Sequence, residues 1–101
     1  MRVRYLRGAL QNIADISQYI RQHNPAAAVR VGQRIRQVVA LIAERPNLGK
    51  PGIFPGTREF KIPDLPYRVI YRVVATDEPS AVLEILRVHH IRRQLLPPDW
   101  A

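Results

Sequence analysis

Basic and imidazole side chains near the end of the chain are the groups best suited to chemistry. Two segments there are rich in Val, Ile and Tyr and alternate polar with apolar residues, as strands do. Arg68 and Arg72 are four residues apart, so a strand would place both on one face. Such a face can bind phosphate groups. The complete set is Lys61, Arg68, Arg72, Arg87, His89, His90, Arg92 and Arg93.

With a proton-transfer group, a basic face of this kind could also cleave RNA. The cations of the face would stabilise the pentacovalent phosphate, and a histidine would shuttle the proton because free imidazole titrates near neutral pH. In the alternative interpretation, the stretch from Arg68 to Val74 lies under a helix and its arginines snorkel outward. A histidine at a strand end would then be a structural hydrogen-bonding group. The residues alone leave both interpretations open.

Other kinds of site are not expected. The chain has no cysteine, and His89 and His90 are adjacent, so a strand would point them to opposite faces. The loop GKPGIFPG has neither P-loop spacing nor the context of a dinucleotide fingerprint. Serine occurs only as Ser17 and Ser80, without a G-x-S-x-G motif. We therefore expect no metal, no cofactor and no serine triad.

Positive charge dominates the composition. Sixteen Lys and Arg oppose eight Asp and Glu, a formal net charge of +8, and all but Lys50 and Lys61 of the sixteen are arginine. Residues 1–50 carry nine bases and two acids (+7), whereas residues 51–101 carry seven bases and six acids (+1). Arginine forms bidentate contacts with phosphates and carboxylates. The charge therefore favours nucleic acid or an acidic protein as a partner, against the alternative of solvated helix faces.

The elements that must position these residues indicate a single domain over residues 1–101 with an α+β fold. Apolar residues recur at helical spacing in two segments separated by Asn24-Pro25, where Asn is a favoured N-cap and Pro a favoured first helical residue. We expect an antiparallel helix hairpin packed on a small, curved, mostly antiparallel sheet. The expected order is strand 2–6, helix 9–23, helix 25–44, loop 46–56, and strands 57–62, 67–74 and 81–90.

Targeting segments are not expected. The opening MRVRYLRGALQN has no continuous apolar run, and no segment approaches the roughly 20 apolar residues that span a bilayer. We expect a soluble, cytoplasmic protein with no membrane contact. The tail contains Pro97-Pro98, so it should not continue as a regular element, and Trp100 is expected to pack its indole on the sheet edge or a helix.

Two stretches of the sequence resemble a known superfamily. The runs GTREFKIPDLPYRVIYRVV and LEILRVHHIRR are similar to the C-terminal half of the RelE/ParE superfamily, the toxins of bacterial type II toxin–antitoxin pairs. The helix hairpin ending in RPNLGKPG also fits, so the resemblance covers nearly the whole chain. It implies a growth-arresting toxin that is neutralised by a short acidic antitoxin wrapped around it, in an oligomer formed through the antitoxin. The complex often represses its own operon.

The RelE-like branch consists of ribosome-dependent endoribonucleases that act on mRNA. Its basic strand residues correspond to Lys61 and Arg68 in this sequence. If the protein is such a ribonuclease, the resemblance implies that Lys61, Arg68 and His90 are its catalytic residues. Another basic position is replaced by Glu59, the arginine after the last strand falls near Ile91, and the late tyrosine has no counterpart in the tail QLLPPDW. These departures weaken the resemblance to this branch.

The ParE-like branch poisons DNA gyrase and is not enzymatic. Its ending resembles Arg87, Val88, His90 and Arg92, and its entry into the second strand resembles Gly56-Thr57-Arg58-Glu59. The resemblance therefore favours inhibition of DNA gyrase, with the ribonuclease as the alternative. A non-toxic, partner-binding protein of the same fold is the second alternative.

Two sets of contact residues are expected. An acidic amphipathic antitoxin segment would lie in a groove between the basic helix face and the sheet, with Arg30 and Arg34, one turn apart, contributing to the contact. The alternative is that these two arginines form a solvated helix face. Contact with the target is assigned to the remaining basic residues near the last strands: Arg72, Arg87, His89, Arg92 and Arg93.

Overall fold

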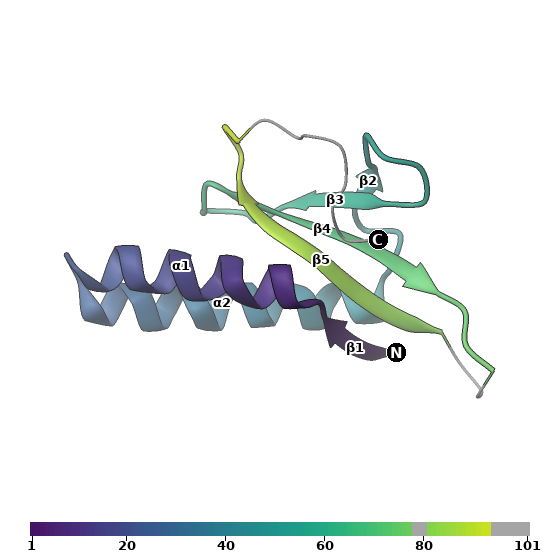
Figure 1. Ribbon diagram of the computed structural model, residues 1–101, viewed down its shortest axis with the longest axis horizontal. Coiled ribbons are helices and arrows are strands. Elements are labelled where there is room, and N and C mark those ends of the chain that lie inside the picture. The colour runs from purple at the N-terminus through teal and green to yellow at the C-terminus, as the bar shows by residue number, and fades with distance from the viewer. Residues whose placement is uncertain (78–80, 94–101) are drawn as a thin grey trace.

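The computed structural model describes residues 1–77 and 81–93, so Trp100 and part of the expected turn at 77–80 lie outside the described residues. The sheet and the helix hairpin form two layers, and the tip of the hairpin projects past the end of the sheet (Figure 1). The elements in chain order are β1 (Arg2–Tyr5), α1 (Arg7–Arg21), α2 (Pro25–Glu44), β2 (Lys50–Pro51), β3 (Arg58–Lys61), β4 (Tyr67–Val74) and β5 (Val82–His90).

The five strands form one sheet in the order β1-β5-β4-β3-β2. β1 runs parallel to β5, and every other neighbouring pair is antiparallel. The predicted α+β class and the mostly antiparallel sheet are therefore confirmed. The sequence did not predict β2, because two residues are too short for an alternating pattern and one of them is Pro51.

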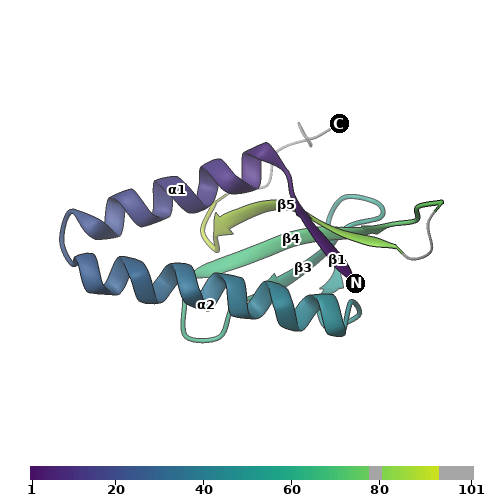
Figure 2. The ribbon, with the colours of Figure 1, turned by 90° about the horizontal axis from the view of Figure 1, so that it is seen from below.

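The helix hairpin covers one face of the sheet, and its two helices run antiparallel (Figure 2). The Asn24 side chain accepts a hydrogen bond from the Ala27 backbone N–H at 3.0 Å, and Pro25 is the first residue of α2, as predicted. α1 begins at Arg7, two residues earlier than expected. Its N-cap is Leu6, which gives no side-chain cap, so the sequence held no capping signal there.

The hydrophobic core lies between the hairpin and the sheet. The helices contribute Ala9, Ile35, Val38, Val39 and Ile42, and the strands and their ends contribute Ile62, Val69, Tyr71, Leu83, Ile85 and Val88. Because Val69 and Tyr71 face the helices, the alternating residues Arg68, Ile70 and Arg72 point to the opposite face. The arginines of β4 therefore do not lie under a helix.

A β-bulge in β5 determines which residues share a face beyond it. Ile70 pairs with Arg87, whereas the next residue, Tyr71, pairs with Ile85, so Leu86 is the extra residue. The shift places His89 opposite Arg68 and His90 opposite Tyr67. Within residues 1–77 and 81–93, no helix is long and apolar enough to cross a membrane.

Candidate functional site

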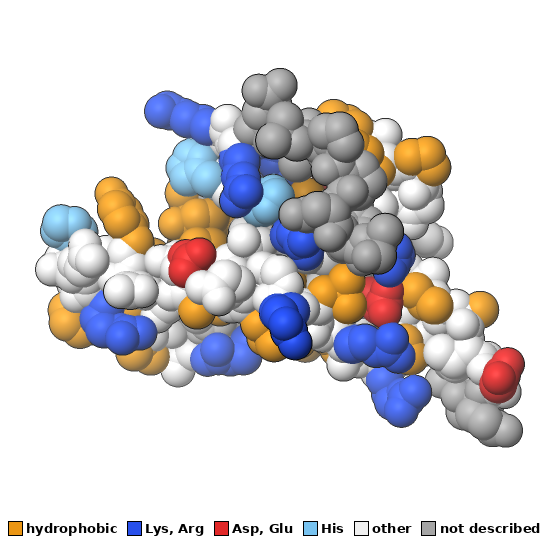
Figure 3. Space-filling view, viewed as in Figure 1, with side chains coloured by type: hydrophobic (Ala, Val, Ile, Leu, Met, Phe, Trp, Pro, Cys, Tyr) orange, Lys and Arg blue, Asp and Glu red, His pale blue; other side chains and the backbone are white. Residues whose placement is uncertain are grey.

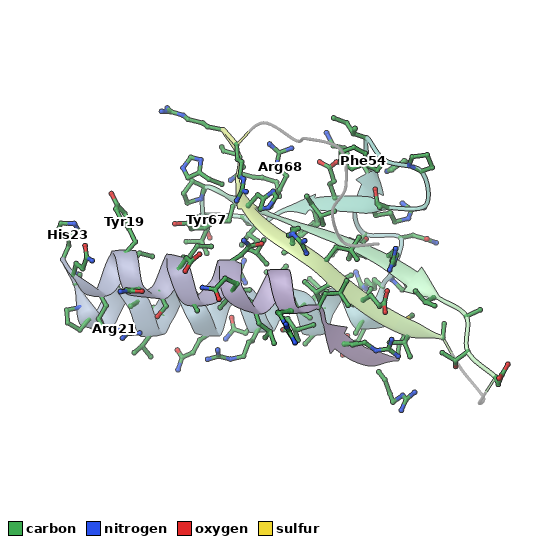
Figure 4. The ribbon with its side chains drawn as sticks, in the orientation of Figure 1. Tyr19, Arg21, His23, Phe54, Tyr67 and Arg68 are labelled. Atoms are coloured by element: carbon green, nitrogen blue, oxygen red, sulfur yellow. The ribbon has the colours of Figure 1, made fainter. Side chains whose placement is uncertain are left out.

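Three basic or imidazole side chains form a row across the face of the sheet that the helices leave uncovered. Arg68 on β4 lies directly between Lys61 on β3 and His89 on β5 in the strand register. Figure 4 shows Arg68 on the side of the sheet away from the hairpin. A hollow of about 260 Å³ opens beside this row, lined by Lys50, Glu59, Lys61, Arg68 and Ile91. We call this hollow the cationic pocket.

The guanidinium of Arg68 is already paired inside the cationic pocket. Its Nη1 donates to Glu59 Oε1 at 3.2 Å, and its Nη2 donates to the Ile91 carbonyl oxygen at 2.5 Å. The second oxygen of Glu59 accepts a hydrogen bond from the Ile53 backbone N–H at 3.1 Å. Glu59 is 7% exposed, so this carboxylate is a buried anion beside the arginine. Nothing in the sequence pattern predicts that Glu59 pairs with Arg68.

His90 does not lie with Lys61 and Arg68. It pairs with Tyr67 on the helix side of the sheet, and the two rings meet edge to face with centroids 5.7 Å apart. Its Nδ1 accepts the Arg92 backbone N–H at 3.1 Å. The structure therefore brings together two of the three residues of the hypothetical ribonuclease site, and the imidazole next to them is that of His89. The bulge that decides this has no signal in the sequence pattern.

His90 instead borders a second hollow, between α1 and the end of the sheet. This apolar groove has a volume of about 480 Å³ and is lined by Asp15, Ile16, Tyr19, Pro66, Tyr67 and His90. Tyr19 projects from α1 on the side where Tyr67 lies (Figure 4). Burial and the neighbouring Tyr19 raise the pKa of Tyr67, so its phenol stays neutral at physiological pH.

The structure thus contains a groove between a helix and the sheet, as the antitoxin hypothesis requires, but α1 forms its helical wall. Arg30 and Arg34 lie on α2 and do not line it. Arg30 is exposed and Arg34 half-buried. Both remain available on the hairpin surface for a partner that extends beyond the groove.

The five residues assigned to target binding differ in accessibility. Arg72 donates through Nε to Glu84 Oε1 at 2.8 Å, and Glu84 also accepts from Arg4 at 2.9 Å. Arg87 bonds the Leu86 carbonyl oxygen at 2.6 Å and lies against Gly8 of α1, and His89 is buried.

Arg92 and Arg93 differ from the other three because both are exposed. They lie in a turn after β5 that is closed by the Arg93 N–H donating to the His90 carbonyl oxygen at 2.9 Å.

Positive side chains extend over the molecule from the hairpin to the strands, with few acidic side chains among them (Figure 3). The three ion pairs within the described ranges are Arg4–Glu84, Arg72–Glu84 and Arg68–Glu59. No cluster of three His, Asp or Glu side chains in residues 1–77 and 81–93 is arranged to hold a metal ion.

Comparison with known proteins identifies the family to which the chain belongs. Residues 3–95 match the model of the family described as the ParE toxin of the type II toxin–antitoxin system parDE. A protein of Sinorhizobium fredii named "Putative toxin Y4kP" is 39% identical over 93 residues, which cover 92% of this chain and 91% of that protein.

Two solved structures share the fold. A chain of the chromosomal ParDE toxin–antitoxin system from P. aeruginosa superposes with a TM-score of 0.79 at 22% identity, covering 89% of this chain and 95% of that one. A chain of the RelBE2 toxin–antitoxin complex from Mycobacterium tuberculosis gives a TM-score of 0.57 at 24% identity, covering 88% and 95%. With the family match over almost the whole chain, the protein belongs to the ParE toxin family of the RelE/ParE superfamily, the toxins of type II toxin–antitoxin systems.

Proposed function

We propose that this toxin arrests growth by inhibiting DNA gyrase, and that an acidic antitoxin neutralises it. The observation that carries the choice of target is the Arg68–Glu59 ion pair. A ribonuclease of this fold needs a free cation to stabilise the pentacovalent phosphate, and here a buried carboxylate already engages the central arginine. The match to the ParE family supports the same choice.

A ribonuclease is the second candidate, and one observation favours it. The row Lys61–Arg68–His89 sets two cations and an imidazole side by side on the sheet face opposite the helices. In that case His89, rather than His90, would be the proton-transfer group. It would need Glu59 to release Arg68 when RNA binds.

The antitoxin would occupy the apolar groove and continue over the helix hairpin. Tyr19 and Tyr67 offer the aromatic surface on which an apolar side chain of the partner can pack. Arg30 and Arg34, on α2, would bind its carboxylates, which is the role proposed for them from sequence. An acidic segment suits this surface because the hairpin half of the chain carries a net charge of +7, from nine bases and two acids in residues 1–50.

The purified toxin should inhibit negative supercoiling of relaxed plasmid by gyrase in a reaction that contains no ribosomes. Addition of the cognate antitoxin should restore supercoiling, because an antitoxin seated in the groove that His90 borders would sterically hinder contact through the adjacent turn of Arg92 and Arg93. The same toxin preparation is incubated in parallel with mRNA and translating ribosomes. Cleaved mRNA together with unaffected supercoiling would reject gyrase and select the ribonuclease. Inactivity in both assays and in growing cells would identify a non-toxic protein that only binds its partner.

A further inference from the structure

Among the described residues, the side chains that line the cationic pocket carry more positive than negative charge. Lys50, Lys61 and Arg68 line it, and Glu59 supplies the opposing charge. Lys50 is the strand partner of Glu59 across β2 and β3, and Lys61 is the strand partner of Arg68 across β3 and β4. These described lining residues therefore carry two net positive charges around a space of about 260 Å³.

Glu59 is placed inside this pocket as an incoming anion would be. It approaches Arg68 at 3.2 Å, and its other oxygen receives a backbone N–H from Ile53 at 3.1 Å. A guanidinium and a backbone N–H are the donors that hold phosphate oxygens in proteins. Glu59 thus uses the hydrogen bonds that a phosphate group would use.

The hydrogen bonds of Arg68 leave room for a further acceptor. Its Nε is buried and is bonded to no group of the described residues, whereas Nη1 and Nη2 are engaged by Glu59 and Ile91. A buried donor without an acceptor is unfavourable, so the present arrangement does not fully satisfy the arginine. A tetrahedral anion with several oxygens would satisfy it better than a single carboxylate oxygen does.

We propose that the cationic pocket is a binding site for a phosphate group and that Glu59 is its intramolecular competitor. A phosphate-bearing ligand must displace the Glu59 carboxylate from Arg68 before it can bind. Glu59 therefore keeps the affinity of the pocket for phosphates low while its ion pair with Arg68 stays intact. This site is independent of which macromolecule the toxin poisons, because phosphate binding is measured without gyrase or ribosome.

The test compares two carboxylate variants of the pocket with a control outside it. Glu59→Gln removes the competing charge, and Glu59→Asp keeps the charge but shortens the side chain by one methylene, so that it withdraws from Arg68. Glu44→Gln, at the exposed end of α2, changes the net charge by the same amount as Glu59→Gln. The two probes are pyrophosphate and a short single-stranded DNA oligonucleotide. DNA has no 2′-hydroxyl group, so the oligonucleotide cannot be cleaved by attack of that group during the titration. Comparison of the two probes distinguishes free phosphate from a nucleic-acid backbone as the source of the ligand.

We expect Glu59→Gln to lower the Kd for at least one of the two probes about tenfold at low salt, since charge-assisted contacts to a freed arginine are among the stronger hydrogen bonds. Glu59→Asp should lower it about threefold, and Glu44→Gln by less than about twofold, because exposed charges are screened. The NMR signal of Arg68 Nε–H should move on titration and identify the pocket. The proposal is overturned if Glu59→Gln and Glu44→Gln give equal affinities, or if the gain persists in Glu59→Gln/Arg68→Gln.

Folding of each variant is checked by circular dichroism before titration. If Glu59→Gln does not fold, phosphate binding to the pocket is tested with the single variants Glu59→Asp and Lys61→Gln. Lys61→Gln should weaken the residual binding of pyrophosphate about threefold, because it removes one of the three cations. Unchanged binding in both of these variants would also reject the site.

Discussion

Replacing Arg92 and Arg93 together by Gln should raise the toxin concentration that half-inhibits gyrase about tenfold or more. Of the five residues assigned to target binding, these two are exposed, whereas Arg72 is paired with Glu84 and His89 is buried. Arginine is enriched among the interface residues whose truncation costs more than about 1 kcal/mol, and about 1.4 kcal/mol corresponds to a factor of ten. The supercoiling assay measures the shift directly.

The matched control for this variant is Arg30→Gln/Arg34→Gln, which removes the same charge from α2. That variant should inhibit gyrase as the native toxin does but bind the antitoxin about tenfold more weakly, with a flatter salt dependence. Conversely, Arg92→Gln/Arg93→Gln should bind the antitoxin as the native toxin does. Equal losses in both assays for both variants would show that total charge matters and that neither pair forms a specific contact.

Tyr71→Phe should lower the free energy of unfolding by about 2–3 kcal/mol. The buried hydroxyl of Tyr71 donates to the Pro46 carbonyl oxygen at 2.7 Å and accepts from the Gly49 N–H at 2.9 Å. Burial raises the pKa of Tyr71 despite the opposing effects of the Gly49 N–H and Arg58, so the hydroxyl keeps its proton and can donate. Its loss leaves two backbone groups without partners, each at about 1–3 kcal/mol. Urea denaturation measures the difference.

The control for Tyr71→Phe is Tyr67→Phe, on the same strand and only half-buried, which should cost less than about 1 kcal/mol. The same connection explains why residue 49 is glycine. A Cβ there would lie 2.7 Å from the Tyr71 hydroxyl oxygen and 2.8 Å from the Glu59 carbonyl oxygen. If the Tyr71→Phe variant is as stable as the native protein, the hydrogen bonds between the Tyr71 hydroxyl and the loop after α2 do not stabilise the fold.

Much of this fold could be predicted from local patterns. The Asn24-Pro25 start of α2 has a direct physical cause, and the Tyr67–Val74 strand has a strong alternating pattern, so both were predicted with the observed bounds. The parallel pairing of β1 with β5 is a contact between the two ends of the chain, about 80 residues apart, and no local pattern encodes it.

The candidate site was harder to predict because it depends on pairing between strands. The bulge at Leu86 moves His89 to the face of Arg68 and sends His90 to the groove. Likewise, the burial of Glu59 beside Arg68 follows from the β3–β4 register, in which Glu59 pairs with Ile70 and Lys61 with Arg68. The sequence predicted the strands that carry these side chains, whereas only the register decides which side chains meet.

The central claim, that the toxin stops DNA metabolism rather than translation, is tested most directly in growing bacterial cells. The protein is induced, and incorporation of labelled thymidine and labelled methionine is followed side by side, with Arg92→Gln/Arg93→Gln as the control. A gyrase inhibitor predicts that thymidine incorporation falls first and is accompanied by a DNA-damage response, while methionine incorporation declines later. An early collapse of methionine incorporation with thymidine incorporation unaffected would contradict the claim and assign the toxin to the ribosome.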